Sequence, residues 1–133
     1  MRLKKLIVIA GLAIACSEQA ATALTDDKLN GQLLKLDPAT RLEQTCDTEV
    51  MMRINEENKD FKVDKVIAYS LSEPTVSDNL IRAPGAVLRS HGNWYRLSFL
   101  CETGPRHLDA HKLQYKIGPV IPREEWTQYY LYD

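Results

Sequence analysis

The spacing of the apolar residues changes once along the chain, and this change restricts the fold. Between residues 37 and 58, four apolar residues recur at every fourth position and share one helix face: Leu42, Cys46, Val50 and Ile54. From residue 61 onward, apolar and polar residues alternate in short runs, as in half-buried strands. The pattern predicts an α+β fold, in which an N-terminal helix packs on a small antiparallel sheet of three to four strands.

The helix has two candidate N-termini. Asp37 can cap it with Pro38 at the first helical position, or Thr40 and Glu43 can form a capping box. Five charged residues of this segment lie mostly away from the apolar face: Arg41, Glu43, Asp47, Arg53 and Glu57. Residues 24–36 read as a flexible lead-in, weakly helical or extended.

The strands are predicted from period-two alternation and turn residues. "FKVDKVIAYSL" (61–71) reads as a strand whose phase breaks at Lys65 and Val66. A connection follows, with short helical content at "VSDNLI" (76–81) and an end at Pro84-Gly85. "AVLRSHGNWYRLSFLCET" (86–103) reads as a hairpin with its turn at His91-Gly92-Asn93.

The C-terminal third predicts one more strand and a short helix. "RHLDAHKLQYKIG" (106–118) follows a turn at Gly104-Pro105 and alternates like a strand. A short C-terminal helix is expected to begin at Pro122. Its aromatic residues, Trp126, Tyr129 and Tyr130, would share one face that covers an open edge or end of the sheet.

Residues 1–23 have the pattern of a secretory signal peptide. Basic residues at positions 2, 4 and 5 precede a ten-residue apolar run, and Ala21-Thr22-Ala23 suits cleavage after Ala23. The apolar run is half the length of a membrane-spanning helix, so no transmembrane span is expected. We therefore expect a periplasmic protein. The alternative is a lipoprotein anchored through Cys16, although Ala13-Ile14-Ala15 matches the required signal poorly.

The cysteine count agrees with export. Either cut leaves Cys46 and Cys101 as the one pair available in an oxidising compartment, and such pairs most often form a disulfide. Cys46 lies on the apolar helix face, and Cys101 faces the same side as Tyr95, Leu97 and Phe99. One disulfide is therefore expected between the helix and the sheet.

Length and charge limit the organisation and the partners. Cleavage after Ala23 leaves residues 24–133, with 14 basic and 17 acidic side chains. This length suits one α+β domain, which we place at residues 37–133. The excess of acidic residues argues against nucleic acid or an anionic membrane as a partner.

Three segments carry a resemblance: "LEQTCD", "WYRLSFLC" and "IGPVIPREEW", in this order. They are similar to segments of a family of small exported alphaproteobacterial proteins catalogued as a domain of unknown function (DUF930). The likeness extends from "LDPATRLEQTCD" to the C-terminus. It implies an envelope location and a small α+β domain, and it brings no catalytic residues.

The candidates for chemistry are few. His107, Asp109 and His111 alternate on an expected strand, but collinear ligands would leave the two histidines about 13 Å apart, too far to enclose one metal ion. A serine hydrolase would need a signature such as Gly-x-Ser-x-Gly, which is missing from the sequence. No cofactor is implied.

Trp94 and Arg96 are the better candidates for a ligand or partner surface. Trp94 is out of phase with the Tyr95 row, so it would lie on the other side of the sheet, with Arg96 beside it. An exposed tryptophan with an arginine suits recognition of sugars, peptides or carboxylates. The alternative, which we favour, is that the C-terminal segment covers Trp94.

These observations favour a non-enzymatic binding or structural module of the periplasm, whose partner is an envelope protein or glycan. Two other functions remain open. One is an enzyme that acts on an envelope polymer, and the other is a metal-binding protein that uses His107, Asp109 and His111.

Overall fold

The computed structural model describes residues 27–133. The predicted signal peptide, its cleavage after Ala23 and the alternative lipid anchor at Cys16 lie outside the described residues. Residues 27–33 are helical, and Leu33 is buried. The side chain of Arg41 donates hydrogen bonds to the carbonyls of Leu33 and Leu36, so this lead-in is attached to the following helix.

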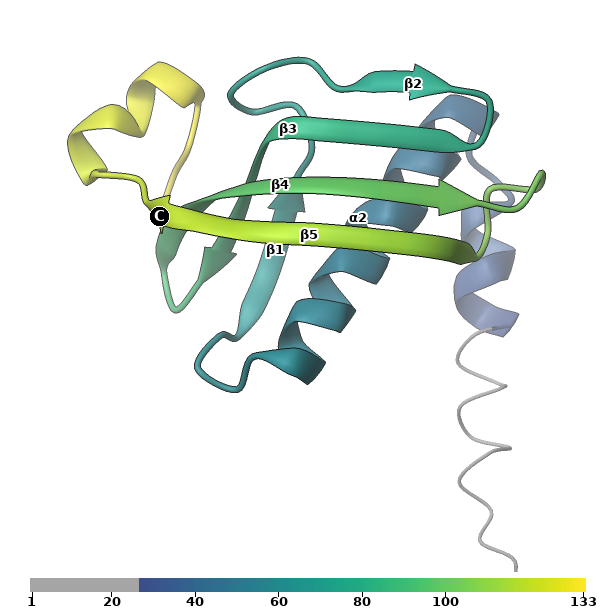
Figure 1. Ribbon diagram of the computed structural model, residues 1–133, viewed down its shortest axis with the longest axis horizontal. Coiled ribbons are helices and arrows are strands. Elements are labelled where there is room, and N and C mark those ends of the chain that lie inside the picture. Colours follow the sequence, from purple (N-terminus) through teal and green to yellow (C-terminus); the bar gives the residue numbers. More distant parts are fainter. Residues whose placement is uncertain (1–26) are drawn as a thin grey trace, which may run out of the picture.

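One long helix packs on a five-stranded antiparallel sheet (Figure 1). The helix is α2 (Pro38–Glu57), and the strands are β1 (Val63–Ile67), β2 (Thr75–Ser77), β3 (Leu80–Ser90), β4 (Asn93–Thr103) and β5 (Ala110–Val120). The order of the strands is β1-β3-β4-β5, and β2 pairs with the free half of the β3 edge. The α+β class is confirmed, and the sheet has one or two strands more than predicted.

Helix α2 begins at the first of the two predicted caps. The carboxylate of Asp37 accepts hydrogen bonds from the backbone N–H and the hydroxyl of Thr40, at 3.1 and 2.6 Å, and Pro38 occupies the first turn. Thr40 thus serves the Asp37 cap and does not form a capping box. The predicted apolar face is buried against the sheet, and its residues are Leu42, Cys46, Val50 and Ile54.

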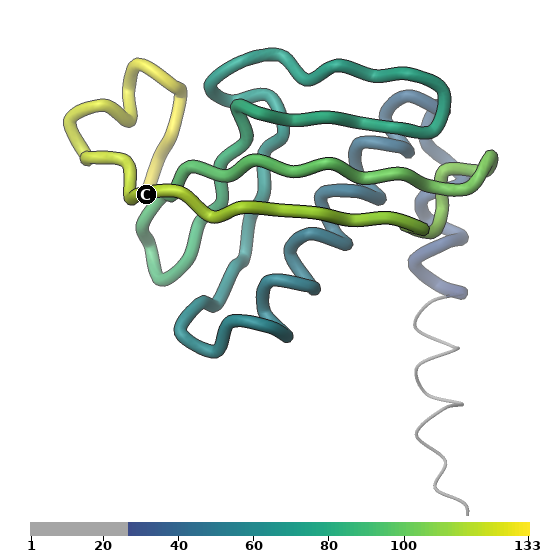
Figure 2. Tube along the Cα trace, in the orientation of Figure 1, coloured from purple at the N-terminus to yellow at the C-terminus, as the bar shows by residue number. Residues whose placement is uncertain are grey.

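The predicted hairpin is formed by β3 and β4. His91 and Gly92 occupy its two-residue turn with φ values of 49° and 77°, and Asn93 begins the second strand. A turn with positive φ at both central residues matches the twist of the flanking strands. In Figure 2 this turn projects from the same end of the sheet as the C-terminal segment.

The connection between β1 and β3 differs from the prediction. The expected helical content at residues 76–81 is wrong, because this stretch forms a hairpin of β2 and β3. Asp78 turns the chain with φ of 50°, which aspartate tolerates better than most residues. Pro84 and Gly85 do not end the connection either, since they lie at a register shift within β3.

Strand β1 is shorter than the predicted 61–71. Its pairing with β3 shifts register between Val63 and Lys65, next to the break in the alternation at Lys65 and Val66. After Ile67 the chain leaves the sheet and forms a loop of residues 68–74, defined here as the 68–74 loop. The backbone N–H of Leu71 donates to the carbonyl of Gly85 at 2.8 Å, so this loop stays attached to the bulge of β3.

Gly85 allows this attachment. A Cβ atom on Gly85 would overlap both the hydroxyl oxygen and the backbone nitrogen of Ser72. A side chain at position 85 would therefore push the 68–74 loop away from the sheet.

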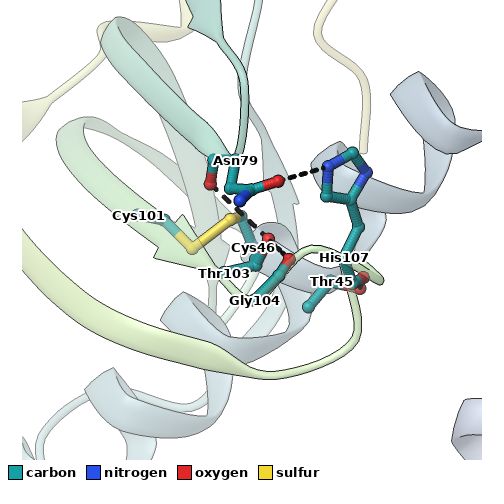
Figure 3. The surroundings of a disulfide bond; sticks show 7 residues. All are labelled: Thr45, Cys46, Asn79, Cys101, Thr103, Gly104 and His107. Carbon is teal, nitrogen blue, oxygen red and sulfur yellow. Dashed lines mark hydrogen bonds between the residues drawn. A yellow bond between two sulfur atoms is a disulfide. The ribbon is translucent and has the colours of Figure 1, made fainter.

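Helix and sheet are also joined covalently. Cys46 and Cys101 form the predicted disulfide, with their Cα atoms 5.9 Å apart and a sequence separation of 55 (Figure 3). Both cysteines are fully buried, so the bond lies inside the main core.

The C-terminal segment builds a second, smaller core on the other side of the sheet. The predicted short C-terminal helix is present there as two 3₁₀ turns, Arg123–Glu125 and Thr127–Tyr129. Five buried residues form this core: Val87, Trp94, Ile121, Trp126 and Leu131. Tyr130 adopts φ of 57° and is 89% exposed, so the prediction that it shares a buried face with Trp126 is wrong.

Candidate functional site

A ligand-sized hollow among the described residues lies beside β1, where three other segments meet it. We call it the Asp47 pocket, and its volume is about 640 Å³. Two elements of the main fold form one side of it: α2 with Glu43, Gln44 and Asp47, and β1 with Lys65, Val66 and Ile67. This volume falls in the range that small-molecule sites occupy in proteins.

The other side of the pocket is formed by the 68–74 loop and the C-terminal segment. The 68–74 loop contributes Tyr69, Ser70 and Glu73, and the C-terminal segment contributes Tyr129, Tyr130 and Tyr132. The hydroxyl of Ser70 donates to the carbonyl of Tyr129 at 3.4 Å, a long contact that joins these two segments. The Gly85 bulge thus holds one side of the pocket by holding the loop.

Asp47 is the most unusual residue of the pocket. Its side chain is only 9% exposed, and its Oδ1 atom is shielded from solvent with no hydrogen-bond partner. It is the one buried side-chain polar atom among residues 27–133 that has no partner. Burial, and to a smaller extent the neighbouring Glu43, raise the pKa of Asp47 to about 8.

Two further carboxyl groups surround Asp47. Glu43 precedes it by one helical turn, and Glu73 comes from the 68–74 loop. Partial burial raises the pKa of Glu43, and the charge of Glu73 raises it further. Glu43 therefore lies close enough to Asp47 to oppose its ionisation, and three carboxyl groups make the pocket acidic.

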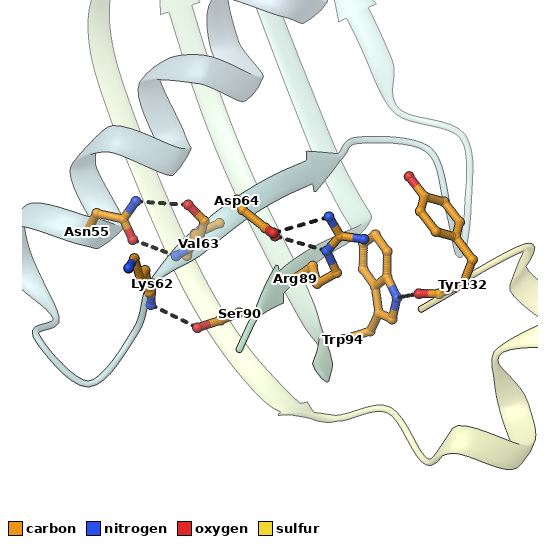
Figure 4. A network of polar contacts seen from close by, with 8 residues as sticks. All are labelled: Asn55, Lys62, Val63, Asp64, Arg89, Ser90, Trp94 and Tyr132. Carbon is orange, nitrogen blue, oxygen red and sulfur yellow. Dashed lines mark hydrogen bonds and ion pairs between the residues drawn. The ribbon is translucent and has the colours of Figure 1, made fainter. Parts of the chain in front are cut away.

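The aromatic side of the pocket rests on the second core. Trp94 donates its indole N–H to the carbonyl of Tyr132 at 2.8 Å, and the two rings meet edge to face at 5.8 Å (Figure 4). The guanidinium of Arg89 lies 5.5 Å from the centre of each ring and pairs with both carboxylate oxygens of Asp64. These contacts fix Tyr132 at the border of the pocket.

The predicted pair Trp94 and Arg96 differs in exposure, because Trp94 is buried and Arg96 is exposed. Trp94 has no exposed surface, so it cannot serve as an exposed recognition residue, and the C-terminal segment covers it as the alternative held. Arg96 lies on the same face of β4 and is exposed. Neither residue lines the Asp47 pocket.

The predicted row of His107, Asp109 and His111 is not formed. Strand β5 begins at Ala110, and His107 lies before it in a turn with φ of 57°. One ring nitrogen contacts the carbonyl of Pro38 at 2.8 Å. The other contacts the side-chain oxygen of Asn79 at 3.0 Å (Figure 3). Thr45 also donates to the His107 carbonyl at 2.6 Å, so His107 links α2 to the β2–β3 turn.

Metal binding and serine chemistry receive no support from this geometry. Within residues 27–133, no group of three or more His, Cys, Asp or Glu side chains is arranged to hold a metal ion. Ser70 lines the Asp47 pocket, but no histidine does, so the pocket lacks the base of a serine hydrolase.

Sequence reasoning missed Asp47. Its position next to Cys46 puts it at the border of the apolar helix face, and we assigned it to the polar side with Glu43. Its burial comes from the residues of β1, the 68–74 loop and the C-terminal segment that surround the pocket. The one available signal was the i, i+4 spacing of Glu43 and Asp47, which places two carboxyl groups together on one side of the helix.

Fold and pocket together define a small disulfide-bonded α+β domain with a ligand-sized, acidic and tyrosine-rich pocket. The chain belongs to the family described as Domain of Unknown Function (DUF930), whose model matches residues 33–131. This match confirms the family that the sequence resembles. The chain matches no curated protein and no solved structure. No helix in residues 27–133 is long and apolar enough to cross a membrane.

Proposed function

We propose that this protein is exported to the periplasm and acts there as a non-enzymatic binding module of the cell envelope, through the Asp47 pocket. The observation that carries the binding role is the buried Asp47 carboxyl group, whose Oδ1 atom has no partner in the protein. Native proteins satisfy nearly all buried polar atoms. A ligand that supplies the missing hydrogen bond would remove this exception.

The exposed aromatic residues support the same role. Seven large hydrophobic side chains are exposed among the described residues, and three of them, Tyr69, Tyr130 and Tyr132, line the Asp47 pocket. Tyrosine offers an apolar ring and a polar hydroxyl, so it is common in surfaces that bind partners. Exposed tyrosines around a pocket therefore favour recognition over a purely structural role.

Export is supported by two features outside the pocket. The N-terminal residues have the charge and apolar pattern of a signal peptide. The disulfide between Cys46 and Cys101 suits an oxidising compartment, because such bonds are rare in the cytosol. The lipid anchor at Cys16 is the alternative form of the same proposal.

The intact mass of the protein purified from its native envelope tests export. We expect a chain that begins at Leu24 and takes up alkylating reagent at two thiols only after reduction. An acylated Cys16 at the N-terminus would favour the lipoprotein form. A chain that retains Met1 and has free thiols would contradict export.

Nuclear magnetic resonance (NMR) shift mapping tests the binding role. The oxidised domain is titrated separately with n-butylammonium, N-acetylglucosamine, a neutral tripeptide and inorganic phosphate. We expect at least one of them to shift the amides of Asp47 and Tyr69 saturably, while Gln114 on β5 stays unchanged. The matched variants are Tyr69→Ala in the pocket and Val76→Ala outside it, because both side chains are more than half exposed. If none of the four probes moves the pocket amides, the binding role is wrong.

A further inference from the structure

The Asp47 pocket lacks a hydrogen-bond donor. Asp47 Oδ1 is an acceptor that no N–H or O–H of the described residues reaches. Burial of such an atom is unfavourable unless a partner is supplied. A ligand that fits this pocket should therefore carry a hydrogen-bond donor that reaches Asp47 Oδ1.

The pocket also lacks a paired cation. Glu43, Asp47 and Glu73 contribute three carboxyl groups, against one ammonium group from Lys65. Three ion pairs of the described residues lie outside the pocket lining or use no carboxylate of the pocket: Arg53 with Glu57, Arg89 with Asp64 and Arg123 with Asp133. Lys65 instead lies over the ring of Tyr132, with its Nζ atom 5.8 Å from the ring centre. A cationic ligand would balance this charge, and an anionic ligand would be repelled.

The tyrosines that line the pocket also favour a positively charged ligand. The face of an aromatic ring attracts cations within about 6 Å of its centre. The ring of Tyr132 already has two cationic neighbours, Lys65 and Arg89, at 5.8 and 5.5 Å. Tyr69 and Tyr130 are exposed beside it, and no ring or cation contact is formed by either in the described part of the chain.

We propose that the Asp47 pocket binds a primary ammonium group, which donates to the Asp47 carboxylate while its alkyl chain lies against the exposed tyrosines. This inference rests on the proposed binding function and adds the chemical class of the ligand. A primary ammonium group combines what the pocket lacks, an N–H donor and a positive charge, in one small group.

Ligand binding is coupled to a proton. Because the pKa of Asp47 is about 8, its carboxyl group in the empty pocket is mainly protonated below that pH. An ammonium ion favours the carboxylate, so the Asp47 proton passes to solvent when the ion pair forms. The other titratable groups around the pocket are Glu43 on α2, Lys65 on β1, Tyr69 and Glu73 on the 68–74 loop, and Tyr129, Tyr130 and Tyr132 at the C-terminus.

The test compares n-butylammonium with the uncharged 1-butanol by NMR titration of the pocket amides. We expect the ammonium ion to bind at least tenfold more tightly. Its Kd should fall by up to roughly tenfold for each pH unit between about pH 6 and pH 8, because Asp47 must ionise. Calorimetry in buffers of different ionisation enthalpy should show proton release on binding.

Three variants make the test specific. Asp47→Asn keeps the shape of the side chain and should raise the Kd at least tenfold and abolish its pH dependence. Glu73→Gln, on an exposed loop residue, should raise the Kd two- to threefold. Glu56→Gln is the control, since Glu56 is exposed on the same helix and does not line the pocket.

The outcomes separate this inference from the binding function. If 1-butanol or N-acetylglucosamine binds as tightly as the ammonium ion, or Asp47→Asn has no effect on its Kd, the ammonium assignment is overturned and the binding function stands. If none of the ligands moves the pocket amides, both fail.

Discussion

The indole N–H of Trp94 donates a 2.8 Å hydrogen bond to the backbone carbonyl of Tyr132, and this bond joins strand β4 to the end of the chain. Trp94 has no exposed surface, and the carbonyl that it contacts belongs to a residue of the Asp47 pocket. The bond therefore connects the second core to the pocket. A change in the core should be felt at the aromatic side of the pocket.

Truncation of Trp94 should destabilise the fold and release the C-terminal segment. Removal of a buried aromatic side chain typically costs about 3 to 5 kcal/mol, and we expect Trp94→Ala to lie in this range. Urea denaturation measures the cost, and limited proteolysis measures the release of the C-terminus. The control is Tyr130→Ala, which should change stability by less than about 0.5 kcal/mol because this side chain is 89% exposed. Equal effects of the two variants would contradict the role given to Trp94.

Loss of the disulfide should cost about 4 kcal/mol. This value follows from the chain-entropy model for a cross-link that spans 55 residues. The variant with Cys46→Ser and Cys101→Ser should unfold at lower urea than the oxidised protein and be unaffected by reductant. The unmodified protein should lose a similar amount of stability when it is reduced. A protein equally stable with and without reductant would show that the bond does not stabilise the fold.

Asp47 should make the protein less stable as the pH rises. Its pKa is raised on folding, so the folded state holds the proton more tightly than the unfolded state does. This contribution is complete below the unfolded pKa of about 4 and is lost as the pH passes through about 8. We expect the free energy of unfolding to fall between these values, by at most about 1.4 kcal/mol per pH unit. In Asp47→Asn this slope should disappear.

Asp64 provides the control of opposite sign. The hydrogen bond from Arg89 lowers its pKa, so Asp64 stabilises the fold above its unfolded pKa, and this contribution is lost as the pH falls. Asp64 is exposed, so the effect is small. Asp64→Asn should leave the loss of stability toward pH 8 unchanged. A slope that survives in Asp47→Asn would contradict the assignment to Asp47.

Gly85→Ala should loosen the 68–74 loop. The new methyl group would overlap the backbone of Ser72, and overpacking of this kind costs about 1 to 3 kcal/mol. Thermal unfolding measures the loss, and hydrogen exchange at Leu71 measures the broken contact with the Gly85 carbonyl. Gly31→Ala is the matched control. No atom lies within 4 Å of its Cβ position in a helical segment, so it should be neutral or slightly stabilising.

The parts of the fold that depend on local pattern could be predicted from the sequence. The fourfold spacing from Leu42 to Ile54 placed Cys46 on the buried face of the helix, and alternation in β4 placed Cys101 on the facing side. Gly92 next to Asn93 indicated the hairpin turn because these residue types tolerate positive φ, and the turn forms at His91 and Gly92.

The rest depends on contacts between distant segments. All three residues of β2 are exposed, so its strand character comes from pairing with β3 and leaves no burial pattern in the sequence. Asp47 is surrounded by β1, the 68–74 loop and the C-terminal segment, which follow it in the chain by about 20 to 85 residues. The spacing of apolar residues along the sequence could not show that these segments meet around the Asp47 carboxyl group.

The most direct test of the Asp47 pocket as a cation site is an NMR titration of the Asp47 side-chain carboxyl carbon, with and without saturating n-butylammonium. In the free protein we expect a pKa of about 8, well above the ordinary 3.8. Saturation should lower this pKa by at least one unit, since the ammonium ion favours the carboxylate. An ordinary pKa in the free protein, or a raised pKa that the ligand leaves unchanged, would contradict the account.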